Sequence, residues 1–115
     1  PLSMLPEQFS KIFEGKDIRD YGIGLSKENF EFHDKHCIIP NALVLSYALA
    51  VVTSGSVNNI YLAGFDGYDQ GDARNDEVND LFLKFKQAKP DSKVISITPT
   101  KYKNLISKSV YGIRE

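Results

Sequence analysis

Between residues 60 and 68 the chain reads Ile60-Tyr-Leu-Ala-Gly-Phe-Asp-Gly-Tyr68, which begins with four apolar residues in a row. An unbroken apolar run of this kind is typical of a strand buried on both faces of a parallel α/β sheet. In open sheets of that class, ligands bind beside the carboxyl ends of the strands. The pattern therefore predicts a central strand over residues 60–65 and a ligand site near Asp66.

A different spacing, with apolar residues three and four positions apart, runs through residues 73–88. This spacing places the apolar side chains on one face of a helix. Asp72 or Asn75 is a suitable N-cap, and Pro90 marks the end. The apolar face consists of Val78, Leu81, Phe82 and Phe85.

Residues 42–54 are apolar almost without a polar face. Such a segment predicts a helix that is buried all round rather than amphipathic. Asn41 is the expected N-cap, and Gly55 is expected to end the helix in the left-handed conformation.

Weaker patterns cover the rest of the chain. We expect a strand over residues 93–98, closed by Pro99, and a short helix over Leu5–Phe13. The remaining segments are a short strand at 21–25, one irregular strand or two short pieces over 29–39, and a short helix with an extended tail over 102–113.

The order helix, strand, helix, strand predicts parallel strands joined by a right-handed crossover. We therefore expect an α/β fold with a mainly parallel sheet and helices on both faces. The 115 residues are enough for a single domain with its own core. We interpret residues 1–115 as one such domain.

Charge and cysteine content narrow the classes of partner. The net charge is −1, so no overall field attracts nucleic acid or an acidic membrane. The longest apolar run, residues 42–52, is too short to insert across a bilayer. Cys37 is the only cysteine, so no disulfide forms within the chain, which fits a reducing compartment. We expect a cytoplasmic protein with neither nucleic-acid binding nor membrane insertion.

The first candidate site is the loop Asp66-Gly-Tyr-Asp-Gln-Gly-Asp72. Its carboxylates could hold a magnesium ion or accept hydrogen bonds from sugar hydroxyls, although the spacing is not that of a calcium loop. The alternative is structural, with Asp66 capping a turn and Asp72 capping the next helix. Arg74 could bind a phosphate or carboxylate with two hydrogen bonds, or simply neutralise the neighbouring carboxylates.

The second candidate is Thr98-Pro-Thr-Lys-Tyr102, which follows the next predicted strand. In a parallel sheet this loop lies at the same edge as Asp66. Its hydroxyl groups and lysine could meet a phosphate or a sugar, or they could belong to an exposed turn. The phosphate-binding patterns G-x-G-x-x-G and G-x-x-x-x-G-K-[ST] do not occur in the sequence. The expected ligand-binding residues of both loops are Asp66, Tyr68, Asp69, Arg74, Thr98 and Lys101.

The segment His33-Asp-Lys-His-Cys37 brings two imidazoles and a thiol together in sequence. Zinc would need a carboxylate to complete the site, because the chain has no other histidine or cysteine. A cysteine–histidine nucleophile pair is a second alternative. We favour Cys37 as a small core residue, and we expect no catalytic residue, no metal site and no cofactor in this domain.

Two longer stretches resemble known proteins. Ala42-Leu-Val-Leu-Ser-Tyr-Ala-Leu-Ala50, Gly55 and Asn59-Ile-Tyr-Leu-Ala-Gly-Phe-Asp66 resemble Rossmann-like domains of bacterial cell-surface sialyltransferases. Leu62-Ala-Gly-Phe-Asp-Gly-Tyr68 with Ile97-Thr-Pro-Thr-Lys-Tyr102 more closely resembles the C-terminal region of aldolase-type proteins from bacterial polysaccharide gene clusters. In those proteins a barrel similar to 4-hydroxy-2-oxovalerate aldolase and HMG-CoA lyase precedes this region.

This resemblance spans roughly residues 41–102 and implies a three-layer Rossmann-like arrangement and an accessory domain without activity of its own. It also implies that the chain is a C-terminal fragment of a longer protein, in which residues 1–40 are partly linker. The parent protein would be an aldolase (a lyase) of cell-surface polysaccharide or lipopolysaccharide biosynthesis, with its barrel as the partner of this domain. Gly64, Asp66 and Tyr68 carry over as site-edge residues, and the implied ligand is a sugar or nucleotide sugar. Two alternatives stay open: a glycosyltransferase-like domain that acts alone, and a purely structural domain that serves homo-oligomer assembly.

Overall fold

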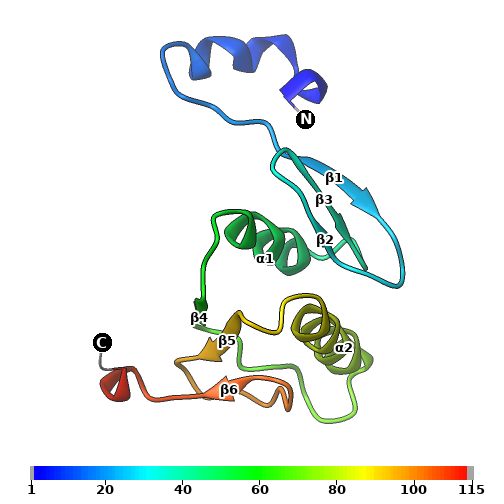
Figure 1. The fold of residues 1–115 in the computed structure, drawn as a ribbon, viewed down its shortest axis with the longest axis vertical. Coiled ribbons are helices and arrows are strands. Elements are labelled where there is room, and N and C mark those ends of the chain that lie inside the picture. Colours follow the sequence, from blue (N-terminus) through cyan, green and yellow to red (C-terminus); the bar gives the residue numbers. More distant parts are fainter. Residues whose placement is uncertain (1, 114–115) are drawn as a thin grey trace.

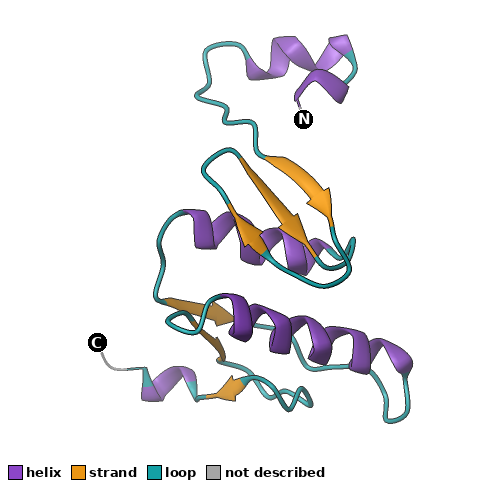
Figure 2. Ribbon diagram, turned by 45° about the vertical axis from the view of Figure 1, so that its right-hand side comes forward, coloured by secondary structure: helices purple, strands orange, loops and turns teal. Residues whose placement is uncertain are grey.

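The computed structural model describes residues 2–113; Pro1, Arg114 and Glu115 lie outside the described part. The fold is mixed α/β, with two three-stranded sheets and two α-helices between residues 22 and 107 (Figures 1 and 2). The expected α/β class is therefore confirmed at this level. The strands do not join into one sheet.

The first sheet has the order β1-β3-β2 and is mixed. Strand β1 (Gly22–Leu25) pairs in parallel with β3 (His36–Ile39), and β2 (Glu31–Phe32) pairs antiparallel with β3. Of the two alternatives for residues 29–39, two short strands is correct.

The second sheet has the order β4-β5-β6 and is entirely parallel. Helix α2 (Ala73–Ala88) connects β4 (Asn59–Leu62) to β5 (Lys93–Ser96), so the predicted parallel pair with a helical crossover is confirmed. Strand β6 (Ile106–Ser107) was not predicted, because two residues are too few to show an alternation of apolar and polar positions. Its connection to β5 is anchored on α2, where Asn79 Oδ1 accepts from Lys103 N at 3.1 Å.

The prediction that the strand near residue 60 is central and buried on both faces is wrong. Strand β4 ends at Leu62 and forms an edge of its sheet. Tyr61 is 45% exposed on the outward face, whereas Leu62 is buried. An edge strand leaves part of its surface in water, and Tyr61 tolerates this position because its phenol is polar.

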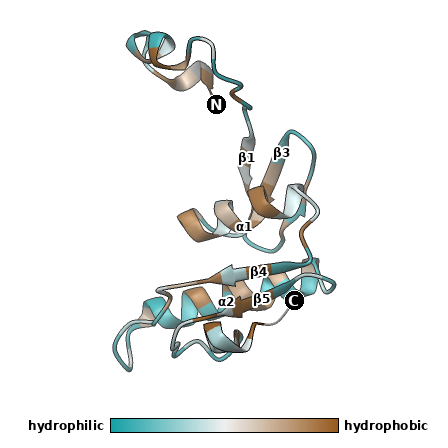
Figure 3. Cartoon of the chain, turned by 90° about the vertical axis from the view of Figure 1, so that its left-hand side faces the viewer, coloured by the Kyte–Doolittle hydropathy of each residue, from teal (hydrophilic) through white to brown (hydrophobic). Residues whose placement is uncertain are grey.

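Helix α1 (Val44–Ser54) is also less buried than its sequence predicts. It lies against β2 and β3 and buries one face there, including Leu49 and Ala50. The opposite face carries Val44, which is 85% exposed, and the half-exposed Val51 and Val52. Figure 3 shows how strongly apolar this helix is along its length.

The caps of α1 differ from the expected ones. Leu43 is the N-cap. Asn41 lies two residues earlier and stabilises the start of the helix, because its Oδ1 accepts hydrogen bonds from Leu43 N at 3.3 Å and from the Ser46 hydroxyl. Gly55 does end the helix, but with φ −82°. Ser56 takes the left-handed conformation instead, with φ 60°.

Helix α2 has the predicted limits. Asp72 is its N-cap, and the Asp72 side chain accepts from Arg74 N at 2.9 Å. The four residues of the predicted apolar face are all buried. Local signals were sufficient here because the spacing of the apolar residues, the capping residue and the acidic residues at the amino end all favour the same helix.

One apolar core joins the two sheets. Phe85 of α2 meets the rings of Phe30 and Phe32 edge-on, with centroids 5.6 and 5.9 Å away, and so connects α2 to the first sheet. Cys37 and Leu49 belong to the same buried cluster as Leu62 and Leu105 of the second half. The core therefore extends across the whole body of the molecule.

The first turns of the chain stand apart from this body. Segments η1 (Leu2–Met4) and η2 (Glu7–Phe13) are 3₁₀ helices that lie beyond the first sheet in all three ribbon views (Figures 1–3). Helical structure over Leu5–Phe13 was predicted, but η2 buries none of its residues. A third 3₁₀ helix, η3 (Val110–Gly112), lies near the other end. Within residues 2–113, no helix has the length and apolar character needed to cross a bilayer.

Candidate functional site

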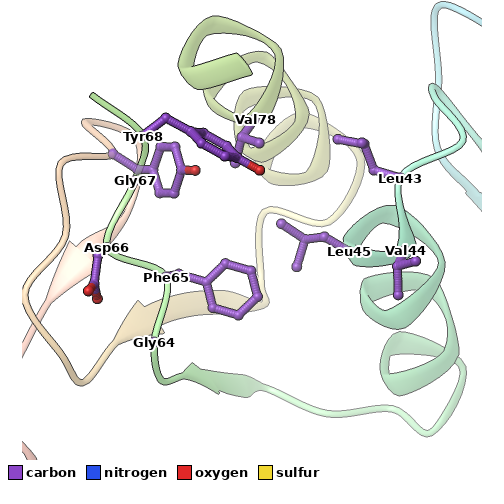
Figure 4. A pocket seen from close by; sticks show the side chains of 10 residues that line it. Leu43, Val44, Leu45, Gly64, Phe65, Asp66, Gly67, Tyr68 and Val78 are labelled. Carbon is purple, nitrogen blue, oxygen red and sulfur yellow. The ribbon is translucent and has the colours of Figure 1, made fainter. Parts of the chain in front are cut away.

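A cavity of about 620 Å³ lies between the first turn of α1 and the loop that follows β4 (Figure 4). One wall is aliphatic and consists of Leu43, Val44 and Leu45. The opposite wall is the backbone and side chains of residues 64–68, and Val78 and Tyr102 complete the lining. The cavity thus adjoins the carboxyl end of β4, where the sequence predicts a ligand site.

Aromatic rings and one carboxylate give the cavity its chemical character. Phe65 points into the space in Figure 4, and the ring of Tyr68 approaches it from the side of α2. Tyr102 contributes a buried phenol. Asp66 is the only residue of the lining with an ionisable carboxyl group, and its side chain is exposed.

Gly67 allows the loop to take its path. It has φ 99°, a conformation that residues with a Cβ rarely adopt. A Cβ at this position would also lie 3.1 Å from the Cβ of Lys101. The close approach of the two loops therefore depends on glycine here.

Hydrogen bonds hold the two predicted loops together. Lys101 N donates to Asp66 O at 2.8 Å, and Gly64 N donates to Thr98 Oγ1 at 2.9 Å. Lys101 Nζ also donates to the backbone oxygen of Tyr68 at 3.3 Å. The prediction that both loops meet at one edge of the sheet is confirmed.

Asn75 fixes the loop from the other side. Its Oδ1 accepts from Tyr68 N at 2.9 Å. Its Nδ2 donates to Tyr68 O at 3.2 Å and to Asp69 O at 3.0 Å. The sequence predicts Asn75 only as a helix cap, so its function in positioning Tyr68 was missed.

Arg74, Tyr68 and Asp72 form a compact group beside the cavity. The guanidinium carbon of Arg74 lies 3.9 Å from the centroid of the Tyr68 ring, in a cation–π contact. Arg74 also donates to Asp72 through Nε at 3.0 Å and through a terminal nitrogen at 2.6 Å. The hydrogen bond from the Arg74 side chain lowers the pKa of Asp72 to about 2. Of the two roles considered for Arg74, it neutralises a neighbouring carboxylate.

The structure brings the six predicted ligand-binding residues into one region but in different roles. Asp66 and Tyr68 line the cavity. Arg74, Thr98 and Lys101 stabilise its loops, and Asp69 is exposed with its backbone oxygen bound to Asn75.

Several lining residues were missed. The aliphatic wall comes from residues 43–45, about twenty positions upstream, and local spacing gives no signal for that contact. Phe65 could have been found, because it lies next to Asp66; Tyr102 was part of the second candidate loop.

The hydroxyl of Tyr102 stays protonated beside the cavity. Burial raises the pKa of Tyr102 above its usual value of 10.0, and the neighbouring Tyr68 raises it further. Its hydroxyl therefore keeps its proton throughout the neutral range. The phenol of Tyr102 can therefore donate, and the exposed carboxylate of Asp66 can accept, hydrogen bonds at this lining.

The histidine–cysteine segment is separate from the cavity. His33 and His36 stack at 4.3 Å between ring centroids and are exposed, whereas Cys37 is fully buried. Burial raises the pKa of the Cys37 thiol. The interpretation of Cys37 as a core residue is confirmed, and no cluster of three or more potential metal ligands occurs among residues 2–113.

In comparisons with protein-family models, with curated proteins and with solved structures, nothing matched the chain. The resemblance to aldolase-linked domains therefore stays a prediction.

Proposed function

We propose that this chain is an accessory, ligand-binding domain and that the cavity beside β4 holds a sugar or the sugar part of a nucleotide sugar. The observation that carries the proposal is the lining of that cavity, with aromatic residues next to one carboxylate. Binding sites for small molecules are typically concave and largely apolar, with few placed polar groups. A sugar ring suits such a lining because it has an apolar face and a polar edge.

The resemblance adds a context to this proposal. The parent protein would be an aldolase-type enzyme of bacterial polysaccharide biosynthesis, whose barrel supplies the chemistry. We further propose that β4, α2 and β5 belong to a three-layer Rossmann-like arrangement, supported by their parallel pairing across a helix. Exposed apolar residues on β1 and α1, such as Leu25 and Val44, support a contact with another domain. An aldolase barrel encoded upstream in the same reading frame would support this context.

Binding can be tested by NMR with ¹⁵N-labelled protein. The probes are glucose, galactose, mannose and N-acetylglucosamine, their 1-phosphates, and the corresponding UDP- or GDP-sugars at millimolar concentration. We expect at least one of them to shift the amide signals of Gly64 and Gly67, which line the cavity. Gly15, which lies after η2 and outside the lining, should not move.

A matched pair of variants locates the binding. Phe65→Leu removes a ring from the cavity, while Phe9→Leu makes the same change in η2, outside it. We expect the Phe65 variant to weaken binding by about tenfold, equivalent to about 1.4 kcal/mol. The Phe9 variant should bind as the wild type does. The absence of any shift with the whole panel, or equal effects of the two variants, would overturn the proposal.

A further inference from the structure

We infer that the cavity selects an uncharged sugar and discriminates against phosphorylated sugars and nucleotide sugars. The inference rests on the proposed function and narrows its ligand class. It follows from the charges at the lining, from the partners of the nearby cations and from the shape of the aliphatic wall.

The only formal charge in the lining is negative. Asp66 contributes it, and no ion pair within residues 2–113 involves Asp66 or Asp69. Two like charges a few ångströms apart repel each other. A phosphate placed near Asp66 would therefore need a cation to compensate.

Arg74 and Lys101, the two cationic side chains of the loops beside the cavity, already have hydrogen-bond partners. Arg74 donates two charge-assisted hydrogen bonds to Asp72, the stronger kind of such bonds. Lys101 Nζ donates to the backbone oxygen of Tyr68, and its main chain is bound to Asp66 O. Freeing Arg74 for a phosphate would break its bonds to Asp72 and its contact with the Tyr68 ring.

The wall formed by α1 offers no cation either. A helix amino end attracts anions, and α1 begins at this wall. However, the side chains that line the cavity there are those of Leu43, Val44 and Leu45, and Figure 4 shows Leu45 directed toward Phe65. These aliphatic groups favour an apolar ligand surface over a solvated phosphate.

Uncharged sugars match the groups that remain. Phe65 and the leucines can cover the C–H face of a sugar ring. Asp66 can accept from its hydroxyl groups, and the buried phenol of Tyr102 can donate to a ring or hydroxyl oxygen. Hydrogen bonds to a charged acceptor are stronger than those between neutral groups, so Asp66 is the polar anchor.

The test titrates each sugar against its own 1-phosphate by NMR, with Gly64 and Gly67 as reporters. We expect the uncharged member of a pair to bind about tenfold more tightly, as repulsion by one nearby carboxylate implies. Equal or tighter binding of the phosphate or of the UDP-sugar would overturn the inference and leave the proposed function in place. If neither member of any pair binds, both fail.

Two amide variants test the role of Asp66. Asp66→Asn removes the charge inside the lining, and Glu77→Gln makes the same kind of change on an exposed position of α2 outside it. We expect Asp66→Asn to weaken the binding of the uncharged sugar and to reduce the ratio between its affinity and that of the sugar 1-phosphate. Glu77→Gln should leave both affinities unchanged. The inference is wrong if the discrimination against phosphate is the same in both variants.

Discussion

Asp72 has two functions at the start of α2. Its side chain accepts from Arg74 N and thereby satisfies one of the free amides of the first helical turn. The same carboxylate binds the Arg74 guanidinium, which in turn lies over Tyr68. One residue thus caps a helix and orders the rim of the cavity.

This arrangement makes a pH-dependent contribution to stability. The pKa of Asp72 is about 2 in the folded protein, below the ordinary value of 3.8. A carboxyl group with a lowered folded-state pKa stabilises the native state above its unfolded pKa. That contribution is present above about pH 4 and is lost as the pH falls from about 4 through about 2.

We predict that Asp72→Asn flattens the loss of stability between about pH 4 and about pH 2. Urea unfolding at a series of pH values, followed by circular dichroism, measures this directly. Asp76→Asn, the same chemical change at an exposed position in the first turn of α2, is the control. An unchanged acid dependence in the Asp72 variant would show that the ion pair with Arg74 does not form in solution.

Among single residues, the sequence identified those whose neighbours are local. Asp66 and Tyr68 were found because they follow a strand, and both line the cavity. Thr98 and Lys101 were placed correctly at the same edge, although they hold loops instead of facing the cavity. The contribution of Asn75 was not found, because its partners depend on the path of a loop.

Among the elements, α2 is the one that the sequence describes best. Its apolar face is buried against the core, and its outer face is polar. The Phe85 side chain on this helix is fully buried, and its ring contacts those of Phe30 and Phe32. Leu83, on the same helix, is 44% exposed.

We predict that Phe85→Ala lowers the free energy of unfolding by about 3–5 kcal/mol, because it leaves a cavity in the core. Leu83→Ala should cost less than about 1 kcal/mol. Urea unfolding monitored by circular dichroism measures both. Phe85→Leu, with a smaller expected loss, replaces the alanine variant if the latter does not fold. Similar losses at the two positions would contradict the burial of this face.

Strand β4 and helix α1 show where local patterns mislead. Both segments are apolar throughout, and both leave one side exposed, as Tyr61 and Val44 illustrate. Hydrophobicity records how well a segment tolerates burial, whereas actual burial depends on what lies next to it. Here the strands divide into two sheets, so β4 lies at an edge.

At the scale of the whole molecule, a single core connects the two sheets. Residues of β3, α1, β4 and α2 belong to one buried cluster. In contrast, η1 and η2 stand apart, and η2 buries no residue. We therefore expect the body to behave as one cooperative unit, to which the first turns contribute little.

We predict a single unfolding transition that has the same midpoint by far-ultraviolet circular dichroism and by tyrosine fluorescence. Deleting residues 1–13 should change the free energy of unfolding by less than about 1 kcal/mol, because no core contact is lost. Two separate transitions would show that the sheets fold independently. A large loss on deletion would show that η2 packs against the body in solution.

Sequence alone determined the α/β class, the limits of α2 and the parallel pairing of β4 and β5, and it narrowed the cap of α2 to Asp72 or Asn75. These features follow from periodicity, capping and chain connectivity, which are properties of short segments. Only the tertiary structure decided that the strands form two sheets, that α1 is half exposed, and that Leu43, Val44 and Leu45 line the same cavity as Phe65. Those outcomes depend on contacts between segments distant in sequence, whose free energy no local pattern contains.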